Sequence, residues 1–389
     1  MADRTGRNGL RIAKIFRNMD SITHIVLGAT IGEALAGRKL GKKALLLGAI
    51  VQSLPDIDFV ASFWLDASRD VWFHRGITHS FLFVLLVTPL LTLIAQRVFR
   101  PSGAGIVGSG AAPQMSTKDW LIFFGLQLFV HIFIDAFNAY GTGWFEPFSH
   151  VRISFHVLFV ADPFYSCWLA ISFLALLILK KDNPARKKWV RFGLLLSSVY
   201  LCYCLGNKWW VDTRVERDLS QQSIRYDRYF TTPTPLNSWL WYVVTEDSTG
   251  YHTGYRSVFD SRSDAFRWQP RRDSLLRPFL YRDDVQYLLL FARGYYTVEQ
   301  WKGRGDADGG GDAKGEREGG GDVGNGKDTL VFNVLRFGEM RGWEDPHAHF
   351  VFHYFLEDSA HNGMVVQRGR FAGWDKERLL AFIRRIRGN

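Results

Sequence analysis

Ionisable side chains lie within or beside apolar stretches in the first half of this 389-residue chain. Two carboxylates follow Pro55, at Asp56 and Asp58, and two imidazoles enclose a short polar run, at His74 and His79. Bare ionisable groups are costly in apolar surroundings unless they are paired or bound to a metal. This feature constrains the fold most, because the chain has to bring these side chains together.

Short apolar segments flank these residues on both sides. They cover residues 21–37, 42–54, 81–97, 119–137, 164–180 and 190–206. We expect each segment to form a helix, with Pro55 ending the second one and placing Asp56 and Asp58 in a loop. Several segments are shorter than the about 20 residues that a spanning helix needs. They predict either a shallow membrane bundle or a buried helical core.

Basic residues concentrate in three connections between these helices, at residues 38–43, 97–118 and 181–191. If consecutive helices alternate in direction, all three connections fall on one side, and the ionisable residues fall at the opposite helix ends. The positive-inside rule then places the basic connections in the cytoplasm. The polar site would face outward, towards the periplasm in a two-membrane bacterium, and the last helix would leave on that side.

The two ends of the chain differ from this apolar region. Residues 1–18 are basic and form either an interfacial helix or a frayed tail. Residues 207–389 predict an accessory α+β domain, with a terminal helix at 373–387 and a disordered Gly-rich loop at 303–327. Its expected strands are residues 240–245, 286–291, 329–335 and 349–356. The remaining residues, 19–206, form the predicted helical domain.

The net charge of +10 and the pI of about 9.5 fit either nucleic acid or an anionic membrane surface. No basic–aromatic nucleic-acid motif is present, whereas long apolar runs are, so we expect membrane lipid as the partner and no nucleic acid. The three cysteines lie in apolar runs and form no disulfide framework.

The spacing of the polar residues suits metal ligation. His131 and Asp135 are four residues apart, so a helix presents both side chains on one face. Asp56 and Asp58 flank one residue and can point the same way from a loop. Mixed imidazole and carboxylate ligands favour Zn²⁺, with Mn²⁺ or Fe²⁺ as alternatives. Each pair alone is a weak signal, because it is more often a hydrogen-bonded core pair or a solvated turn.

Two further residues have alternative interpretations. Arg75 either forms a salt bridge with Asp56 or Asp70, or clamps a phosphate or another oxyanion. Asp162, which precedes Pro163, is either a turn-former or a ligand.

The motifs together resemble a known family. Thr23-His24, Pro55–Asp58, His74–Ser80 and His131–Asp135 are similar to the motifs of the YdjM family of membrane-bound, metal-dependent hydrolases. The resemblance covers roughly residues 19–205. It implies His and Asp ligands, and a distant relation to zinc-dependent phospholipase C and the P1-type nucleases, which are helical enzymes that cleave phosphoesters.

We therefore expect a multi-pass protein of the bacterial inner membrane that hydrolyses a phosphoester, lipid-like substrate through a metal-activated water. Asp58 or Asp135 would accept the proton, and Arg75 would steady developing negative charge. The expected metal ligands are His24, Asp56, Asp58, His74, His79, His131, Asp135 and Asp162. The alternatives are a membrane-anchored binding or assembly protein with a structural metal, and a transporter; clustering of the polar groups at one end of the helices argues against transport.

Overall fold

The structure is a computed structural model of the chain. It describes residues 5–99, 114–301, 329–345, 347–357 and 374–389, with the backbone alone for 5–20. The expected disordered loop at 303–327 lies outside the described residues. The chain forms two compact units. The helical unit comprises residues 18–60 and 73–204, and the C-terminal unit comprises 1–17, 61–72 and 205–389.

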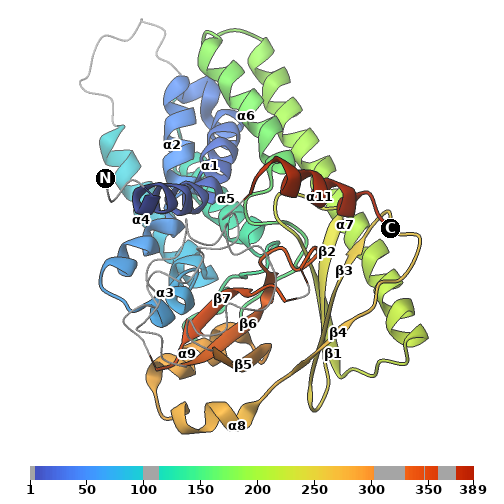
Figure 1. The fold of residues 1–389 in the computed structure, drawn as a ribbon. Helices are drawn as coiled ribbons and strands as arrows, with labels where there is room; N and C mark the ends of the chain where they lie inside the picture. Colours follow the sequence, from blue (N-terminus) through green and yellow to red (C-terminus); the bar gives the residue numbers. More distant parts are fainter. Residues whose placement is uncertain (1–4, 100–113, 302–328, 346, 358–373) are drawn as a thin grey trace, which may run out of the picture. The chain divides into compact units, whose positions relative to one another are not determined.

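Helices dominate the first half of the described chain, as expected, with a non-helical stretch at residues 136–162. They are α1 (Thr5–Leu40), α2 (Lys42–Gln52), the 3-10 helix η1 (Pro55–Phe63), α3 (Ala67–Phe73), the 3-10 turn η2 (Ile77–His79), α4 (Phe81–Val98), α5 (Thr117–Asp135), α6 (Pro163–Ile178) and α7 (Ala185–Gln221) (Figure 1). The basic segment is part of α1 from Thr5 onward. Pro55 ends α2, and Asp56 and Asp58 fall in η1 rather than in an irregular loop.

Small residues let α1 and α2 approach closely. A Cβ atom built on Gly48 of α2 would lie 2.2 Å from the carbonyl oxygen of Gly28, and one on Gly28 would lie 2.5 Å from that of Gly48. Gly32 meets the Ala44 carbonyl in the same way, at 2.3 Å. Such spacing of small residues on both helices permits backbone contact. The contact brings the end of α2, with Gln52, beside the middle of α1.

The basic connections meet at one end of the helical unit. Lys39 at the end of α1 pairs with Asp119 at the start of α5 at 2.6 Å. Arg186 at the start of α7 forms two 2.7 Å bonds to the Glu33 carboxylate, and this ion pair is almost fully buried. Glu33 thus has a buried basic partner. Arg186 also donates to the carbonyls of Leu176 and Leu179, which close the end of α6.

Three of the described helices, α4, α5 and α7, are long and apolar enough to cross a membrane. The pair α2 and η1 passes the same criterion together but is bent by 52° at Ser53–Leu54, and α6 is shorter. The outward side chains of α4, such as Leu85 and Leu86, are exposed. Exposed leucines along a whole helix face are typical of contact with lipid.

The C-terminal unit contains two antiparallel sheets. The first has the order β1 (Arg228–Pro233), β2 (Leu240–Glu246), β3 (Gly250–Ser257), β4 (Arg267–Pro270), and the second the order β5 (Tyr296–Trp301), β6 (Thr329–Glu339), β7 (Phe350–Phe355). Its short helices are α8 (Asp273–Leu276), η3 (Arg277–Phe279), α9 (Asp283–Ala292) and α11 (Lys376–Ile386). The prediction of a helical first part and an α+β second part is confirmed.

One expected strand is wrong: residues 286–291 belong to α9. This run is too short to distinguish the hydrophobic period of a helix from that of a strand. In the structure Val285, Leu288 and Phe291 are buried, and Leu290 is exposed, which is helical spacing. Two aspartates in the first turn of α9 also stabilise the helix, because their negative charge lies at the positive end of the helix dipole.

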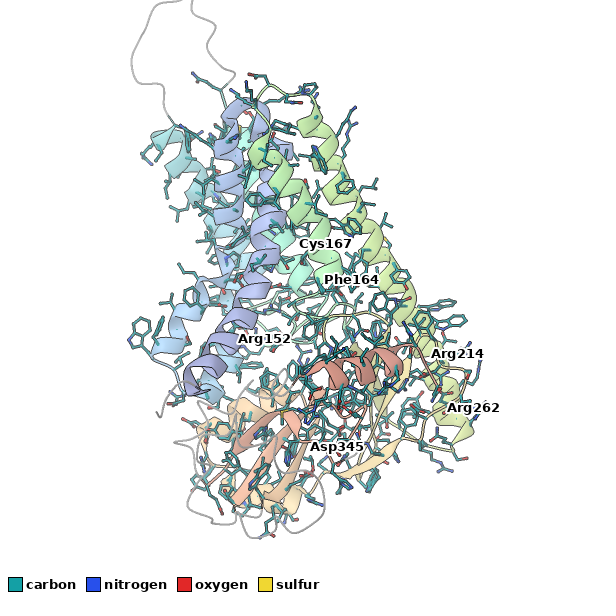
Figure 2. All side chains as sticks on the ribbon, turned by 45° about the horizontal axis from the view of Figure 1, so that its top comes forward. Arg152, Phe164, Cys167, Arg214, Arg262 and Asp345 are labelled. Atoms are coloured by element: carbon teal, nitrogen blue, oxygen red, sulfur yellow. The ribbon has the colours of Figure 1, made fainter. Side chains whose placement is uncertain are left out.

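The last helix of the bundle continues past its expected end at residue 206. Val211, Val215 and Leu219 recur every four residues and pack against Trp241 and Val243 of β2. This second half of α7 belongs to the C-terminal unit and carries Arg214, whose guanidinium stacks on Trp210 (Figure 2). Packing against β2 therefore stabilises α7 beyond residue 206, where the apolar pattern of a spanning segment ends.

Gly48→Ala tests the close contact of α1 and α2. Its Cβ would meet helix backbone, so either the helices separate or the backbone shifts, and we expect a loss of about 1–3 kcal/mol of stability. Gly206→Ala in α7 is the matched control, since no atom lies within 4 Å of its Cβ position; it should be neutral or stabilising by up to about 1 kcal/mol. Thermal unfolding of both variants in detergent gives the comparison, and equal stability would contradict the packing argument.

Candidate metal centre

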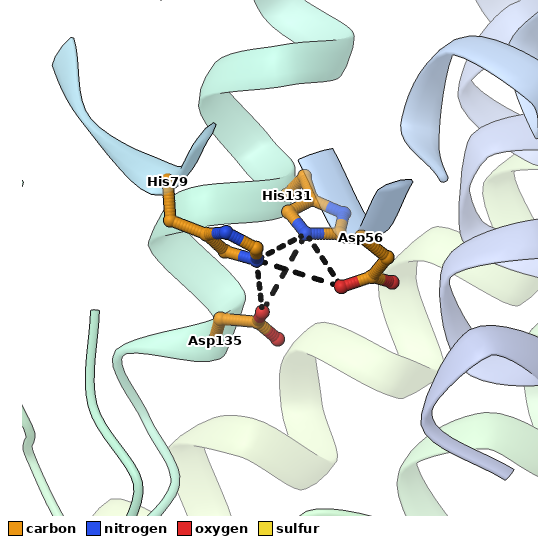
Figure 3. Close-up of side chains that lie close together, drawn as sticks. All are labelled: Asp56, His79, His131 and Asp135. Atoms are coloured by element: carbon orange, nitrogen blue, oxygen red, sulfur yellow. Dashed lines mark hydrogen bonds and ion pairs between the residues drawn. The ribbon is translucent and has the colours of Figure 1, made fainter. Parts of the chain in front are cut away.

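Four side chains from three elements meet at one end of the helical unit. Asp56 comes from η1, His79 from η2, and His131 and Asp135 from the last turns of α5. One ligand atom from each lies within 4.8 Å of the other three. Figure 3 shows the four side chains pointing toward a common centre. The group contains Asp56 but not Asp58, and His79 but not His74. His131 and Asp135 both belong to it.

The distances between these ligand atoms fit a metal ion. The Nε2 atoms of His79 and His131 are 3.1 Å apart. Asp135 Oδ2 lies 3.3 Å and 3.5 Å from them, and Asp56 Oδ1 lies 3.5 Å from each. Ligands placed tetrahedrally at 2.0–2.2 Å from a zinc ion are roughly 3.3–3.6 Å apart. Four of the five separations match that spacing, and the 3.1 Å between the two imidazole nitrogens is slightly shorter. Imidazole nitrogen and carboxylate oxygen are ligand types that zinc, manganese and iron all accept.

The orientation of His131 is set by the backbone of α2. Its Nδ1 atom lies 2.5 Å from the carbonyl oxygen of Gln52, which can only accept, so Nδ1 carries the proton. The Nε2 lone pair therefore faces the centre. The Gln52 amide, oriented by its partners, donates to the Gln127 carbonyl at 2.7 Å and accepts from the His131 N–H at 3.2 Å. Gln127 in turn donates to the Gly28 carbonyl.

A hydroxyl and a carboxylate orient His79 in the same way. Thr78 Oγ1 donates to Asp58 Oδ2 at 2.9 Å, so it can only accept from His79 Nδ1, at 3.0 Å. The remaining nitrogen of His79 faces the centre. Asp58 also accepts from the backbone N–H of Arg75 and pairs with His74 Nδ1 at 2.9 Å. Asp58 is thus held by three donors and acts on the centre through His79.

His24 and Arg75 both contact the carboxylate of Asp135. His24 Nε2 lies 3.0 Å from Asp135 Oδ1, and its ring stacks on that of His131 at 3.9 Å. Arg75 Nε lies 3.5 Å from Asp135 Oδ2, and Arg75 Nη1 donates to Asn138 at 2.8 Å. Arg75 therefore forms a buried pair with Asp135.

The centre is closest to solvent at Asp56. The side chain of Asp56 is 16% exposed, whereas those of His79, His131 and Asp135 are at most 1% exposed. Asp56 Oδ2 has no hydrogen-bond partner in the described part of the chain. Burial lowers the pKa of His79, but hydrogen bonds with Asp135 and Asp56 raise it to about 9. The carboxylates therefore make this pocket favourable for positive charge.

The other candidates surround the group of four or lie away from it. His24, Asp58 and His74 touch its members or their partners, whereas Asp162 caps α6. Its Oδ1 accepts from the N–H groups of Phe164 and Tyr165, and Tyr200 donates to its Oδ2 (Figure 2 labels Phe164). Burial raises the pKa of Asp162 to about 6. Direct metal ligation by the four candidates outside the group stays a prediction; they are His24, Asp58, His74 and Asp162.

Sequence reasoning missed Gln52 and Gln127, which lie behind His131. Both are fully buried in apolar helices, and a buried amide needs partners there. A single glutamine in each of two apolar segments was the available signal. Ser80 caps α4 by accepting from the Phe83 N–H.

Thr78→Val tests how His79 is oriented. The change keeps the shape but removes the link between His79 and Asp58, so we expect metal affinity to fall roughly 10- to 100-fold. Thr88→Val in α4 is the matched control, because the Thr88 hydroxyl is buried without a hydrogen bond to the described residues. Competition with a chelating dye measures both affinities; equal affinities would remove Thr78 from the support of the centre.

Comparison with known proteins finds related sequences for the helical unit. The model of the family described as "YdjM inner membrane protein" matches residues 19–211. Inner membrane protein YbcI of Escherichia coli is 26% identical over 191 residues, which make up 49% of this chain and 96% of that protein. Uncharacterized protein YfhP of Bacillus subtilis is 28% identical over 153 residues, 38% of this chain and 42% of that protein. No solved structure matches the chain. Residues 19–211 are therefore YdjM-like, similar to a family of inner membrane proteins.

Proposed function

We propose that this protein is a metal-dependent hydrolase of the bacterial inner membrane that acts on phosphoester, lipid-like substrates. The observation that carries the proposal is the group of four ligand atoms with its opening at Asp56. Two imidazole nitrogens and two carboxylate oxygens suit zinc first, with manganese or iron as alternatives. The site lies at the ends of helices that are apolar enough to span a membrane. This position favours a substrate that is itself part of the lipid.

Asp56, His79, His131 and Asp135 would hold the ion. A bound divalent ion supplies Lewis acidity, which makes water more acidic and polarises the phosphoryl group. The protein's own residues would do the rest. Asp56 keeps one oxygen, the buried Oδ2, without a hydrogen bond in the described part of the chain, so it is better placed than Asp58 or Asp135 to accept a proton. Both Asp58 oxygens already accept from other groups.

Arg75 would supply fixed positive charge beside the centre. Its guanidinium is buried, bonded to Asn138 and close to Asp135, so its position needs no rearrangement during the reaction. Preorganised donors of this kind stabilise negative charge that develops on an oxyanion. In the same position Arg75 also keeps Asp135 ionised and available as a ligand.

A structural metal is the second candidate function. Four protein ligands complete a tetrahedron, and closed four-ligand sites are typical of structural zinc. In that case the protein would be a membrane-anchored binding or assembly protein. The opening at Asp56 favours catalysis, because zinc can expand to five ligands and so accommodate water or substrate.

His79→Ala separates these two functions. If the centre is catalytic, the variant should lose metal and lose hydrolysis of a generic phosphodiester by at least about 100-fold, yet keep its thermal stability, because the apolar helix faces hold the unit together. If the metal is structural, the variant and chelated wild type should both unfold at lower temperature. His150→Ala is the control, since His150 is exposed and bonds to Glu146 outside the centre.

The outcomes divide cleanly. A wild type that shows no turnover with any supplied metal and unfolds on chelation supports the structural function. A variant that retains both metal and activity removes His79 from the centre. Metal content by atomic emission, unfolding temperature and turnover are measured on the same detergent-purified samples.

The orientation of the centre is also a proposal. The inner-membrane location follows from the family and the apolar helices. Because the basic connections lie at the end opposite to the centre, the positive-inside rule places the centre and the C-terminal unit on the periplasmic side of a multi-pass protein. Reporter fusions at residues 110 and 185 should then report cytoplasm, and one at 250 the periplasm. The reverse pattern would place the chemistry in the cytoplasm.

A further inference from the structure

Aromatic side chains form a continuous, half-exposed surface next to the metal centre. We name it the aromatic shelf; it consists of Phe81, Phe129, Phe133, Trp144, Phe145 and Phe155. Neighbouring rings touch: Phe81 lies 5.3 Å from Trp144 and 5.9 Å from Phe145, and Trp144 lies 5.9 Å from Phe155. Its phenylalanines are 36–46% exposed. Half-exposed aromatic groups of this size mark a binding surface rather than ordinary surface scatter.

The shelf continues the exposed face of a candidate membrane span. On α5, the exposed residues Ile122, Leu126, Phe129 and Phe133 are spaced by four, three and four, so they lie along one stripe. The last two belong to the shelf. Lipid chains that run along α5 would therefore meet the shelf without crossing a polar boundary, which identifies a lipid acyl chain as its occupant.

Backbone hydrogen bonds tie the shelf to the centre. The Phe81 N–H donates to the Trp144 carbonyl at 2.9 Å, and the Trp144 indole donates to the Ile132 carbonyl at 3.0 Å. The next link is Gly143, whose N–H donates to the Arg75 carbonyl at 3.0 Å. Phe81 itself follows His79 by two residues. The shelf and the metal ligands are thus parts of one rigid arrangement.

A second guanidinium lies where the shelf meets the centre. Arg152 donates to the carbonyls of His74 and Arg75, and a Cβ on Gly143 would lie 3.3 Å from Arg152 Nη1. Burial lowers the pKa of Arg152 to about 10, and the Glu146 carboxylate beside it opposes that effect, so it is charged near neutral pH. Two arginines therefore lie at the polar end of an apolar surface, as an anionic amphiphile requires.

We infer that the aromatic shelf binds the acyl chain of a membrane phospholipid whose phosphoester lies at the metal centre. The inference rests on the proposed function of that centre and extends it: the substrate enters sideways from the bilayer, along α5, and not from water. Recognition then divides into an apolar part, which the shelf supplies, and a phosphate part, which Arg75 and the metal ligands supply.

The test uses the full chain in dodecyl maltoside with a phospholipid that carries a photoreactive diazirine on one acyl chain. We expect cross-links within residues 126–155 that excess unlabelled phospholipid removes and that diacylglycerol with the same chains does not. The double variant Phe145→Ser, Phe155→Ser should lower these cross-links at least fivefold. Ile178→Ser is the matched control, because Ile178 is an exposed apolar residue at the far end of α6.

Hydrolysis of a water-soluble phosphodiester is measured on the same proteins. Selective cross-links without any hydrolysis would support the shelf and contradict the proposed function. Hydrolysis that the double variant leaves unchanged for soluble substrate, but reduces for phospholipid, would support both. Cross-links that diacylglycerol removes equally well, or that the double variant leaves unchanged, would overturn the inference and leave the hydrolase untouched.

Discussion

Two imidazole nitrogens that face each other at 3.1 Å govern the rest of the helical unit. His79 and His131 each have Nδ1 held by an acceptor, so both would present a lone pair to the other. Two lone pairs repel at that distance unless a cation lies between them, and the carboxylates of Asp56 and Asp135 add further negative charge. Either a proton or a metal ion must occupy this position. Four of the five separations that the structure shows match tetrahedral zinc, and the fifth, at 3.1 Å between the imidazole nitrogens, is slightly shorter.

The close contact of α1 and α2 makes this arrangement rigid. Gly28 and Gly48 allow the two backbones to touch, which places the Gln52 carbonyl within reach of His131. Gln127 of α5 then bonds to the Gly28 carbonyl. Small residues thus determine where an imidazole points, although they lie well away from the ion. The same apolar surroundings that make the buried amides costly also make their hydrogen bonds difficult to replace.

The sequence allowed the helices, the ligand-bearing motifs and the α+β character of the C-terminal unit to be predicted, because each follows from local periodicity or composition. It did not separate direct ligands from their supports. Asp56 and Asp58 look equivalent in the chain, but the donors around Asp58 come from residues 74–78, and only the fold brings them there. The helix at residues 286–291 was missed for a similar reason. Only the fold shows which side chains are buried, and this burial decides between the period of a helix and that of a strand.

Arg75 connects the metal centre to the loop that carries part of the aromatic shelf. Its backbone has a φ of 62°, a left-handed conformation that costs a non-glycine residue about 1–3 kcal/mol. The strain persists because both the backbone and the side chain are held: the N–H bonds to Asp58, the carbonyl accepts from Gly143, and the guanidinium contacts Asn138 and Asp135. A glycine would relieve the strain but remove the charge. The chain therefore holds one arginine in an unfavourable conformation, which fixes the distance between the metal ligands and the loop that carries Trp144.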